Sequence, residues 1–223
     1  MLRELIHLAR HASSTLALKK RLDQVDLYDT VMKRADDAGF RGRRRALVSG
    51  LRGDVLEIGC GTGMMFEHYG AGARVRALEI DDAFRERARA QAEGRDVEIV
   101  SGDAQALAFP DASFDAVVAC LVFCSIPDAR RALAEARRVL RPGGELRLVE
   151  HVVSDRAIPR ALMHVADPIW LHLNEQGCHM NRDTLATARA VFGEVDVTER
   201  FQVFAPGLPA FPMVAVRARA LLR

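Results

Sequence analysis

The fold of this chain is decided by the stretch Val55-Leu56-Glu57-Ile58-Gly59-Cys60-Gly61-Thr62-Gly63. Residues 55–58 are mostly apolar and predict a buried strand, and we expect a helix to begin near Met64. Between the two, glycine stands at every second position. Glycine lets the backbone reverse sharply, removes side chains that would keep a ligand away, and leaves amide N–H groups pointing outward. The stretch therefore predicts a ligand-binding turn between a strand and a helix.

The spacing of these glycines argues against a dinucleotide ligand. A dinucleotide-binding turn reads G-x-G-x-x-G, which after Gly59 and Gly61 would place the third glycine at position 64. Position 64 is Met64, and the third glycine is Gly63. NAD and FAD are therefore disfavoured, and a plain strand-to-helix turn without a ligand stays open as the alternative.

Composition favours one soluble globular domain. Hydrophobic residues make up 49% of the 223 positions and charged residues 28%. The 32 basic and 30 acidic residues nearly cancel, which disfavours a nucleic-acid partner. The four cysteines include no C-x-x-C pair, so we expect free thiols in a reducing cytoplasm. We expect neither a transmembrane segment, since no apolar run approaches ~20 residues, nor a signal peptide.

Helical periodicity predicts two helices before position 50. Residues 1–21 carry apolar side chains at helical spacing. Three interpretations of this segment stay open: a lid over the substrate pocket, a helix on a membrane surface, and a helix packed on the domain. A second helix is expected over residues 25–38, ended by Gly39, and the basic run 41–45 is interpreted as a solvated helix face. We take residues 1–50 as a helical lid or extension and residues 51–223 as the main domain.

From residue 53 onward, expected strands alternate with expected helices. The strands cover residues 55–58, 74–80, 97–100, 114–122, 145–151, 195–203 and 213–218, and the helices cover 64–69, 82–93, 128–140, 159–173 and 183–192. This alternation predicts a parallel sheet covered on both faces. Only about ten residues separate the last two strands, which is too short for a helical crossover, so these two should pair antiparallel.

An acidic residue follows the second expected strand. Glu79 comes sixteen residues after Gly63. A carboxylate at this strand end can accept hydrogen bonds from both hydroxyls of a nucleoside ribose. Asp81 and Asp82 are the alternatives for this role. The sequence thus predicts a nucleoside-containing ligand beside Glu79.

Together these motifs resemble those of the class I S-adenosylmethionine-dependent methyltransferases. The resemblance covers roughly residues 50–151 and rests on Glu57-x-Gly59-x-Gly61-x-Gly63, Glu79, Gly102-Asp103-Ala104 and Pro142-Gly143-Gly144. It implies an α/β, Rossmann-like fold with a mostly parallel seven-stranded sheet and an antiparallel last strand. It also implies S-adenosylmethionine as the cofactor and S-adenosylhomocysteine as its product.

The resemblance implies a set of cofactor-binding residues. The glycine-rich loop would pass over the amino-acid part of the cofactor, and Asp103 would meet the adenine amino group. The end of the strand at 114–122 would meet the methyl donor. A plain turn residue is the alternative for Asp103. The cofactor-binding residues implied in this way are Glu57, Gly59, Cys60, Gly61, Gly63, Glu79, Ile80, Asp103, Ala104, Cys120 and Leu121.

Three further stretches are similar to the thiol methyltransferase type of this family. They are Leu121-Val122-Phe123-Cys124-Ser125-Ile126-Pro127, Glu150-His151-Val152, and Asp167-Pro168-x-Trp170 continued by Gly177-Cys178-x-x-Asn181-Arg182-Asp183-Thr184. They imply S-methylation of a small thiol. The methyltransferases of quinone biosynthesis share the central motifs, so C- or O-methylation of a quinone or natural-product ring is the alternative. A cofactor-binding scaffold without turnover is a third interpretation. Peripheral membrane contact and the oligomeric state stay open.

The acceptor should bind at the carboxyl ends of the strands. S-adenosylmethionine carries an activated methyl group, so in-line approach matters more than a strong catalyst. His151 is the first candidate to assist, followed by Asp167 and His172. The alternative for His151 is a hydrogen bond to the backbone.

The remaining predictions concern the pocket and metals. The expected substrate-pocket residues are Tyr28, Phe123, Cys124 and Trp170, with core filling as the alternative for Trp170. Asp167-Pro168 is also interpreted as the start of a helix. We expect no metal, because His7 with His11 and His164 with His172 each lack a third ligand.

Overall fold

The computed structural model describes residues 21–174, 176–205 and 210–220. The helix expected near the N-terminus, with His7 and His11, therefore lies outside the described residues. Within them, no helix is long and apolar enough to cross a lipid bilayer.

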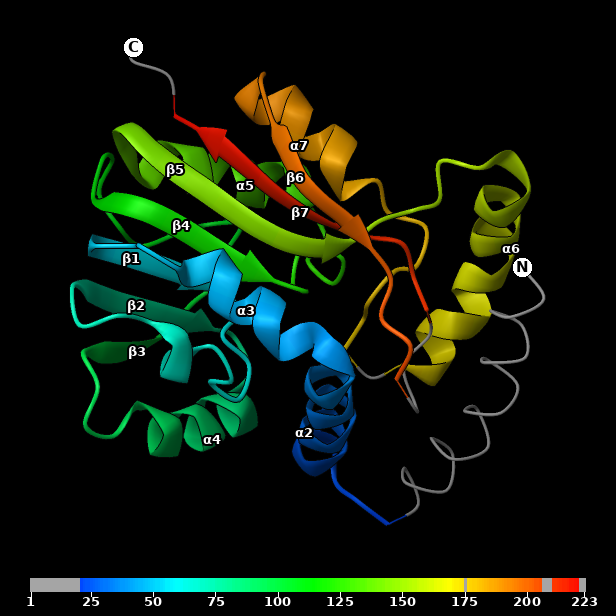
Figure 1. Ribbon diagram of the computed structural model, residues 1–223, viewed down its shortest axis with the longest axis horizontal. Helices are drawn as coiled ribbons and strands as arrows, with labels where there is room; N and C mark the ends of the chain where they lie inside the picture. The colour runs from blue at the N-terminus through cyan, green and yellow to red at the C-terminus, as the bar shows by residue number, and fades with distance from the viewer. Residues whose placement is uncertain (1–20, 175, 206–209, 221–223) are drawn as a thin grey trace.

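Seven strands form one sheet in the order β3-β2-β1-β4-β5-β7-β6 (Figure 1). Neighbouring strands from β3 to β5 are parallel, whereas β7 pairs antiparallel with both β5 and β6. The predicted α/β fold with an antiparallel last strand is thus confirmed. The strands are β1 (Gly53–Ile58), β2 (Ala73–Glu79), β3 (Val97–Ser101), β4 (Phe114–Cys120), β5 (Leu140–His151), β6 (Asp196–Phe201) and β7 (Met213–Arg219).

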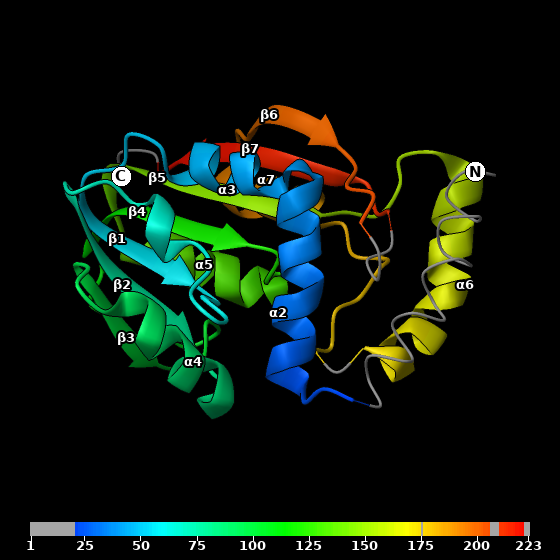
Figure 2. The same ribbon diagram turned by 60° about the horizontal axis from the view of Figure 1, so that its bottom comes forward.

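Helices cover both faces of the sheet (Figure 2). α5 (Ala129–Val139) and α7 (Thr184–Phe192) contribute to the core on one face, and α3 (Arg41–Val48) and α4 (Asp82–Ala92) contribute to the core on the other. α2 (Gln24–Ala35) leads into α3 through a π-helical turn at Asp36–Phe40. Both ribbon views show α6 (Ala157–Leu173) set apart from the sheet.

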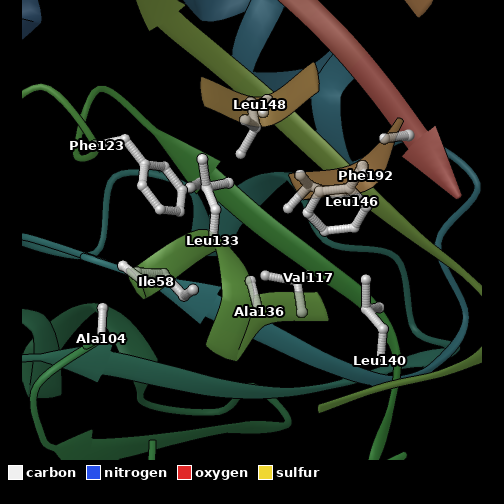
Figure 3. Close-up of a cluster of buried hydrophobic side chains, with 14 of the residues drawn as sticks. Ile58, Ala104, Val117, Phe123, Leu133, Ala136, Leu140, Leu146, Leu148 and Phe192 are labelled. Carbon is white, nitrogen blue, oxygen red and sulfur yellow. The ribbon is translucent and has the colours of Figure 1, made fainter. Parts of the chain in front are cut away.

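The larger core lies between the sheet and α5. Figure 3 shows Val117 of β4 and Leu146 of β5 facing Leu133 and Ala136 of α5, and all four side chains are completely buried. Burying a side chain of the size of valine or leucine contributes roughly 1.5–3 kcal/mol. This layer fixes the strands and thereby the loops at their carboxyl ends.

The predicted helix over residues 64–69 is wrong. Only a 3-10 turn, Phe66–His68, follows the glycine loop, with hydrogen bonds from Phe66 N to Gly63 O and from His68 N to Met65 O, both 3.0 Å. Gly59, Gly61 and Gly63 all have positive φ, so the chain keeps reversing over the residues where a helix would have to start.

The predicted boundary at Pro142-Gly143-Gly144 is also wrong. β5 begins at Leu140 and passes through these residues, because Gly143 and Gly144 exchange backbone hydrogen bonds of 2.9 Å with Ala220. A Cβ atom at Gly144 would lie 2.9 Å from the carbonyl oxygen of Arg141, so this close approach requires glycine.

Three local predictions in the helical parts are corrected. Gly39 (φ 100°) does not end the helical segment, which kinks there and continues into α3. Asp167-Pro168 lies inside α6 rather than at its start, which is capped by Arg156. The basic run is not fully solvated, since Arg44 is only 3% exposed.

Candidate active site

The glycine loop is shaped by its two neighbours. A Cβ atom at Gly59 would lie 2.2 Å from Cγ2 of Val122, in the loop that follows β4. A Cβ atom at Gly61 would lie 3.2 Å from the hydroxyl of Tyr28 in α2. The glycine loop therefore brings backbone without side chains into close contact with the loop after β4 and with α2. The structure places Tyr28, a predicted pocket residue, over the glycine loop.

The carboxylate of Glu79 joins the ends of β1 and β2. Its Oε2 accepts a hydrogen bond from Gly61 N (2.9 Å), and its Oε1 accepts from the backbone N–H groups of Ile80 (2.9 Å) and Asp81 (3.1 Å). The side chain of Arg85 donates to the carbonyl oxygen of Glu79 at 2.7 Å. These contacts hold the carboxylate at the strand end where the sequence predicts a ribose.

Glu57 lies beneath the loop and is 2% exposed. Its Oε2 accepts a hydrogen bond of 2.9 Å from the hydroxyl of Tyr69. Burial raises the pKa of Glu57 to about 8, opposed by that hydrogen bond and by the charge of Arg44. Glu57 is therefore mostly neutral, and it supports the loop from inside the core.

The third predicted cofactor segment follows β3. The carboxylate of Asp103 accepts hydrogen bonds from the backbone N–H and the side-chain amide of Gln105, which lower its pKa. These hydrogen bonds are those of a plain turn residue, which is the alternative that the sequence left open for Asp103. Ala104 is buried, whereas Ile80, beyond β2, is 68% exposed. An exposed isoleucine beside Glu79 offers an apolar surface of the kind on which a base can lie.

A buried cation that the sequence analysis missed lies under the end of β4. Nε of Arg44 is 2.9 Å from Oδ1 of Asp36, and both side chains are 3% exposed. Nη1 of Arg44 is also 3.6 Å from Sγ of Cys120, a predicted cofactor residue. Burial raises the pKa of the Cys120 thiol to about 12 despite the opposing charge of Arg44. The next residue, Leu121, has a positive φ of 60°, so β4 ends in a strained turn.

Sulfur and imidazole groups meet beyond the carboxyl ends of β4 and β5. Nε2 of His151, at the end of β5, lies 2.9 Å from Sγ of Cys178. Sγ of Cys124, in the loop after β4, completes a set of three donor atoms that all lie within 4.8 Å of one another. The hydrogen bond to Cys178 and burial raise the pKa of the Cys124 thiol well above its usual value. Cys124, His151 and Cys178 are thus neighbours. The sequence predicts roles for Cys124 and His151 from separate segments, whereas Cys178 occurs only in a stretch that carries the resemblance.

Asp167 faces a histidine that the sequence analysis did not single out. Its Oδ2 is 2.9 Å from Nδ1 of His179, and its Oδ1 accepts a hydrogen bond of 2.7 Å from Met180 N. Asp167 is 5% exposed, and the His179 side chain is 32% exposed. An ionised carboxylate facing Nδ1 fixes the proton on that nitrogen and leaves Nε2 as the acceptor nitrogen.

Aromatic rings form one wall beside His151. The rings of His151 and Phe211 lie 4.9 Å apart, and those of Phe211 and Trp170 lie 5.5 Å apart in an edge-to-face arrangement. The indole Nε1 of Trp170 is buried without a hydrogen-bond partner among the described residues. Phe211 was missed because it follows a proline-rich stretch with no strand or helix pattern.

Two predicted residues lie elsewhere. Phe123 is completely buried within the core beside α5, so it supports the pocket from behind and does not line it (Figure 3). His172 is exposed on α6. The loop after β4 is held by Glu150, whose Oε1 accepts hydrogen bonds from Val122 N (2.8 Å) and Phe123 N (2.9 Å). Burial raises the pKa of Glu150.

Comparison with known proteins places these features in context. A family model described as "Methyltransferase domain" matches residues 56–148. Human "Thiol S-methyltransferase TMT1B" is 33% identical over 194 residues, which cover 80% of this chain and 79% of that protein. The chain spans 60–79% of the length of the thiol S-methyltransferases of rat, human and mouse that it matches.

A second class of relatives acts on quinones. "Ubiquinone/menaquinone biosynthesis C-methyltransferase UbiE" of Methylobacterium nodulans is 37% identical over 137 residues, which cover 55% of this chain and 54% of that protein. Among solved structures, an S-adenosylmethionine-dependent methyltransferase of Thermotoga maritima superimposes with a TM-score of 0.65 at 22% identity, covering 88% of this chain and 96% of that one. At this identity the likeness shows the common fold.

Proposed function

Because the chain belongs to the S-adenosylmethionine-dependent methyltransferases, we propose that it transfers the methyl group of this cofactor to the sulfur of a small thiol. The family relationship makes S-adenosylmethionine the cofactor. The thiol is favoured by one observation above all: the residues at the acceptor edge are two thiols, a buried imidazole and the Asp167–His179 pair. The imidazoles can accept the proton that a thiol loses as its sulfur is methylated.

The residues on the cofactor side fit S-adenosylmethionine. Three glycines with positive φ leave the loop backbone bare, and a Cβ atom would lie 2.2 Å from Val122 at Gly59 and 2.6 Å from Phe66 at Gly63. We assign this loop, with Glu57, Cys60 and Gly61, to the amino-acid part of the cofactor, Glu79 to the ribose hydroxyls, and Asp103 with Ala104 to the adenine edge. Ile80 then lies against the adenine ring, and Cys120 and Leu121 end the strand next to the methyl donor.

S-adenosylmethionine carries its methyl group on a sulfonium. When that methyl group is transferred, the sulfonium sulfur becomes that of a neutral thioether, which is the leaving group. The proton of the acceptor thiol passes to Nε2 of His179, whose orientation Asp167 fixes. The sulfur then forms a bond to the methyl carbon while the bond from that carbon to the sulfonium breaks. Trp170 and Phe211 exclude water and align the apolar part of the thiol, which supplies much of the acceleration. His172, exposed on α6, takes no part in this step.

The N-terminal segment belongs to the same proposal. We assign residues 1–50 to an extension of the methyltransferase domain, residues 51–223, and its described part, residues 21–50, is mostly helical. Its described part already reaches the site, since Tyr28 of α2 faces Gly61 of the cofactor loop. α6, on the acceptor side, exposes apolar side chains at helical spacing, namely Ile158, Leu162, Val165 and Ile169. Contact with a membrane surface at this face is compatible with the proposed activity.

Methylation of a quinone ring is the second candidate. The UbiE relative and the aromatic wall of Trp170 and Phe211 both favour it, because a flat ring stacks well on such a wall. The two candidates differ in what the site must do. A ring carbon needs a phenolate-like activated ring, whereas a thiol needs only partial ionisation from its usual pKa of ~8.5.

A panel of acceptors distinguishes the two candidates. Purified protein would be incubated with S-adenosylmethionine and, in separate reactions, small alkyl thiols, a quinol, phenols and amines, and products would be detected by mass spectrometry. We expect a gain of one methyl group on the thiols alone. Methylated quinol with untouched thiols would overturn the proposal in favour of the second candidate.

A further inference from the structure

Cys124, His151 and Cys178 form a cluster with the composition of a metal site. Their donor atoms come from three different segments and lie within 4.8 Å of one another. Cys124 and His151 are 2% and 3% exposed, and Cys178 is partly exposed. We propose that the three residues bind one zinc ion and that, if the proposed thiol methylation holds, the acceptor thiol is its fourth ligand.

The donor set favours zinc over other common ions. Two thiolates and one imidazole are typical of zinc sites, and catalytic zinc sites keep three protein ligands and one open position. Zinc binds sulfur at ~2.3 Å and nitrogen at ~2.0–2.1 Å, so tetrahedral ligand atoms lie roughly 3.5–3.8 Å apart. The 2.9 Å between His151 Nε2 and Cys178 Sγ would have to open by about 0.6 Å. Rotation of the partly exposed Cys178 side chain is sufficient for this.

The backbone around each ligand is already fixed. The side chain of Asn174 accepts a hydrogen bond from Cys178 N (2.8 Å) and donates to Cys178 O (3.1 Å). The carbonyl oxygen of Cys124 accepts a hydrogen bond from His179 N at 3.0 Å. His151 lies in the ladder between β5 and β7, opposite Met213. These backbone contacts hold the three ligand residues in position before a metal binds.

No fourth protein ligand joins the cluster among the residues that the structure describes. The two buried carboxylates that act on His151 already accept backbone hydrogen bonds, Glu150 from Val122 N and Phe123 N, and Asp167 from Met180 N. The fourth position would therefore be left to water or to an added ligand. Because Cys178 is the partly exposed member, an acceptor would reach the ion from its side.

A thiol bound to zinc loses its proton, which passes to Nε2 of His179 as in the proposed function. The metal-bound thiolate keeps a lone pair on sulfur, and this sulfur forms the new bond to the methyl carbon as the sulfonium bond breaks. The thioether product carries no charge and binds zinc weakly, so it leaves the ion. The zinc neither gains nor loses electrons in this sequence.

Cobalt(II) is the probe for the test, because its thiolate complexes absorb strongly whereas zinc is colourless. Full-length protein, kept reduced and freed of metal, would be titrated with Co²⁺, and the bound zinc would be counted separately by elemental analysis. We expect one ion per chain, with sulfur-to-cobalt charge-transfer bands. We also expect a small alkyl thiol to add intensity to these bands.

The variants make the assignment specific. Cys178→Ser and Cys124→Ser should each abolish the charge-transfer bands or reduce metal affinity more than 100-fold, and Asn174→Ala should reduce it ~10–100-fold. Cys60→Ser, which changes a buried cysteine outside the cluster, should retain metal binding. Cys178→Ser is the primary test, since this partly exposed side chain can change without disturbing the core.

Three spectral results would overturn the inference or a part of it. Absence of the bands in wild-type protein, or retention of them in Cys178→Ser, would refute the metal site. Metal binding without any spectral response to thiols would refute the role of the acceptor as fourth ligand. Thiol methylation by metal-free protein would leave the proposed function standing while the zinc mechanism fails, so the two failures are distinguishable.

Discussion

The carboxylate of Asp167 in α6 lies 2.9 Å from Nδ1 of His179, in the loop that follows the helix. This contact gives a carboxylate that the sequence marked as catalytic a specific task, which is to orient an imidazole. It also explains why Asp167 is buried inside a helix that is otherwise largely exposed.

Asp167→Asn should lower the turnover of thiol methylation. The amide keeps the shape of the side chain but not its charge, so His179 loses the partner that fixes its tautomer. We expect kcat to fall about 10–100-fold, at or below the lower end of the ~10²–10⁴-fold contribution of proton transfer, because His179 itself remains in place. The affinity for S-adenosylmethionine, measured by calorimetry, should be unchanged. His164→Ala, which changes an exposed histidine of the same helix, is the control and should retain kcat. Equal losses of kcat in Asp167→Asn and His164→Ala would argue against the assignment of Asp167 and His179 as a functional pair.

Glu79→Ala should weaken cofactor binding. The variant loses the proposed bonds to the ribose and the observed hydrogen bond to Gly61 N. Hydrogen bonds to charged groups contribute about 1.5–3 kcal/mol, which corresponds to a roughly 10–100-fold rise in Kd. Calorimetry measures this directly, with Glu86→Ala on the exposed face of α4 as the control. Wild-type affinity in Glu79→Ala would refute the assignment of this carboxylate to the cofactor.

Gly59→Ala should destabilise the loop and abolish cofactor binding. A Cβ atom there would meet Val122 at 2.2 Å, in addition to the cost of a positive φ. Gly50→Ala is a matched control, because Gly50 has a φ of 73° but no atom within 4 Å of the added Cβ. The control should lose about 1–2 kcal/mol of unfolding free energy and still bind cofactor. If Gly59→Ala and Gly50→Ala bind the cofactor equally well, the close approach of Val122 to Gly59 does not determine the shape of the glycine loop.

Glu57 should make stability depend on pH. Its pKa of about 8 in the folded chain exceeds the ordinary glutamate value of 4.5, so the folded chain holds this proton more tightly. Raising the pH from about 4.5 to 8 therefore favours unfolding, and the contribution present at low pH is lost as the pH passes 8. Tyr69, Arg44 and Glu79 are the titratable or charged groups that act on it.

Glu57→Gln tests this pH dependence, since glutamine stays neutral at every pH. The unfolding free energy of the variant relative to wild type should increase between pH 5 and pH 8 in urea titrations. Comparison of the two proteins cancels the contributions of all other titrating groups. A difference that stays constant between pH 5 and pH 8 would mean that Glu57 is already ionised in the folded chain, as a partner of the Arg44 charge.

What could be predicted from the sequence was local. The glycine loop and Glu79 each sit at a strand end that apolar periodicity reveals, and the short connection before Met213 requires an antiparallel pair. The exception is the helix after Gly63, where three positive φ angles prevented it. Local pattern thus predicted the strands correctly and failed where glycine conformation determined the path of the chain.

What could not be predicted depends on contacts between distant segments. Arg44 lies in a basic run that reads as a solvated face, and only its pairing with Asp36 explains its burial. Cys124 and Cys178 are separated by 54 positions, and no spacing rule joins them to His151. His179 was not predicted because its proposed role depends entirely on its contact with Asp167. Each of these required the tertiary structure.

The most direct test of the proposed function follows the methyl group itself. S-adenosylmethionine with a trideuterated methyl group would be offered, in one reaction, to equal concentrations of an alkyl thiol and a quinol, and fragmentation of the products would locate the label. We predict the label on the sulfur of the thiol, with no labelled quinol. Label on the quinol ring or its oxygen, with the thiol unchanged, would contradict the proposed function.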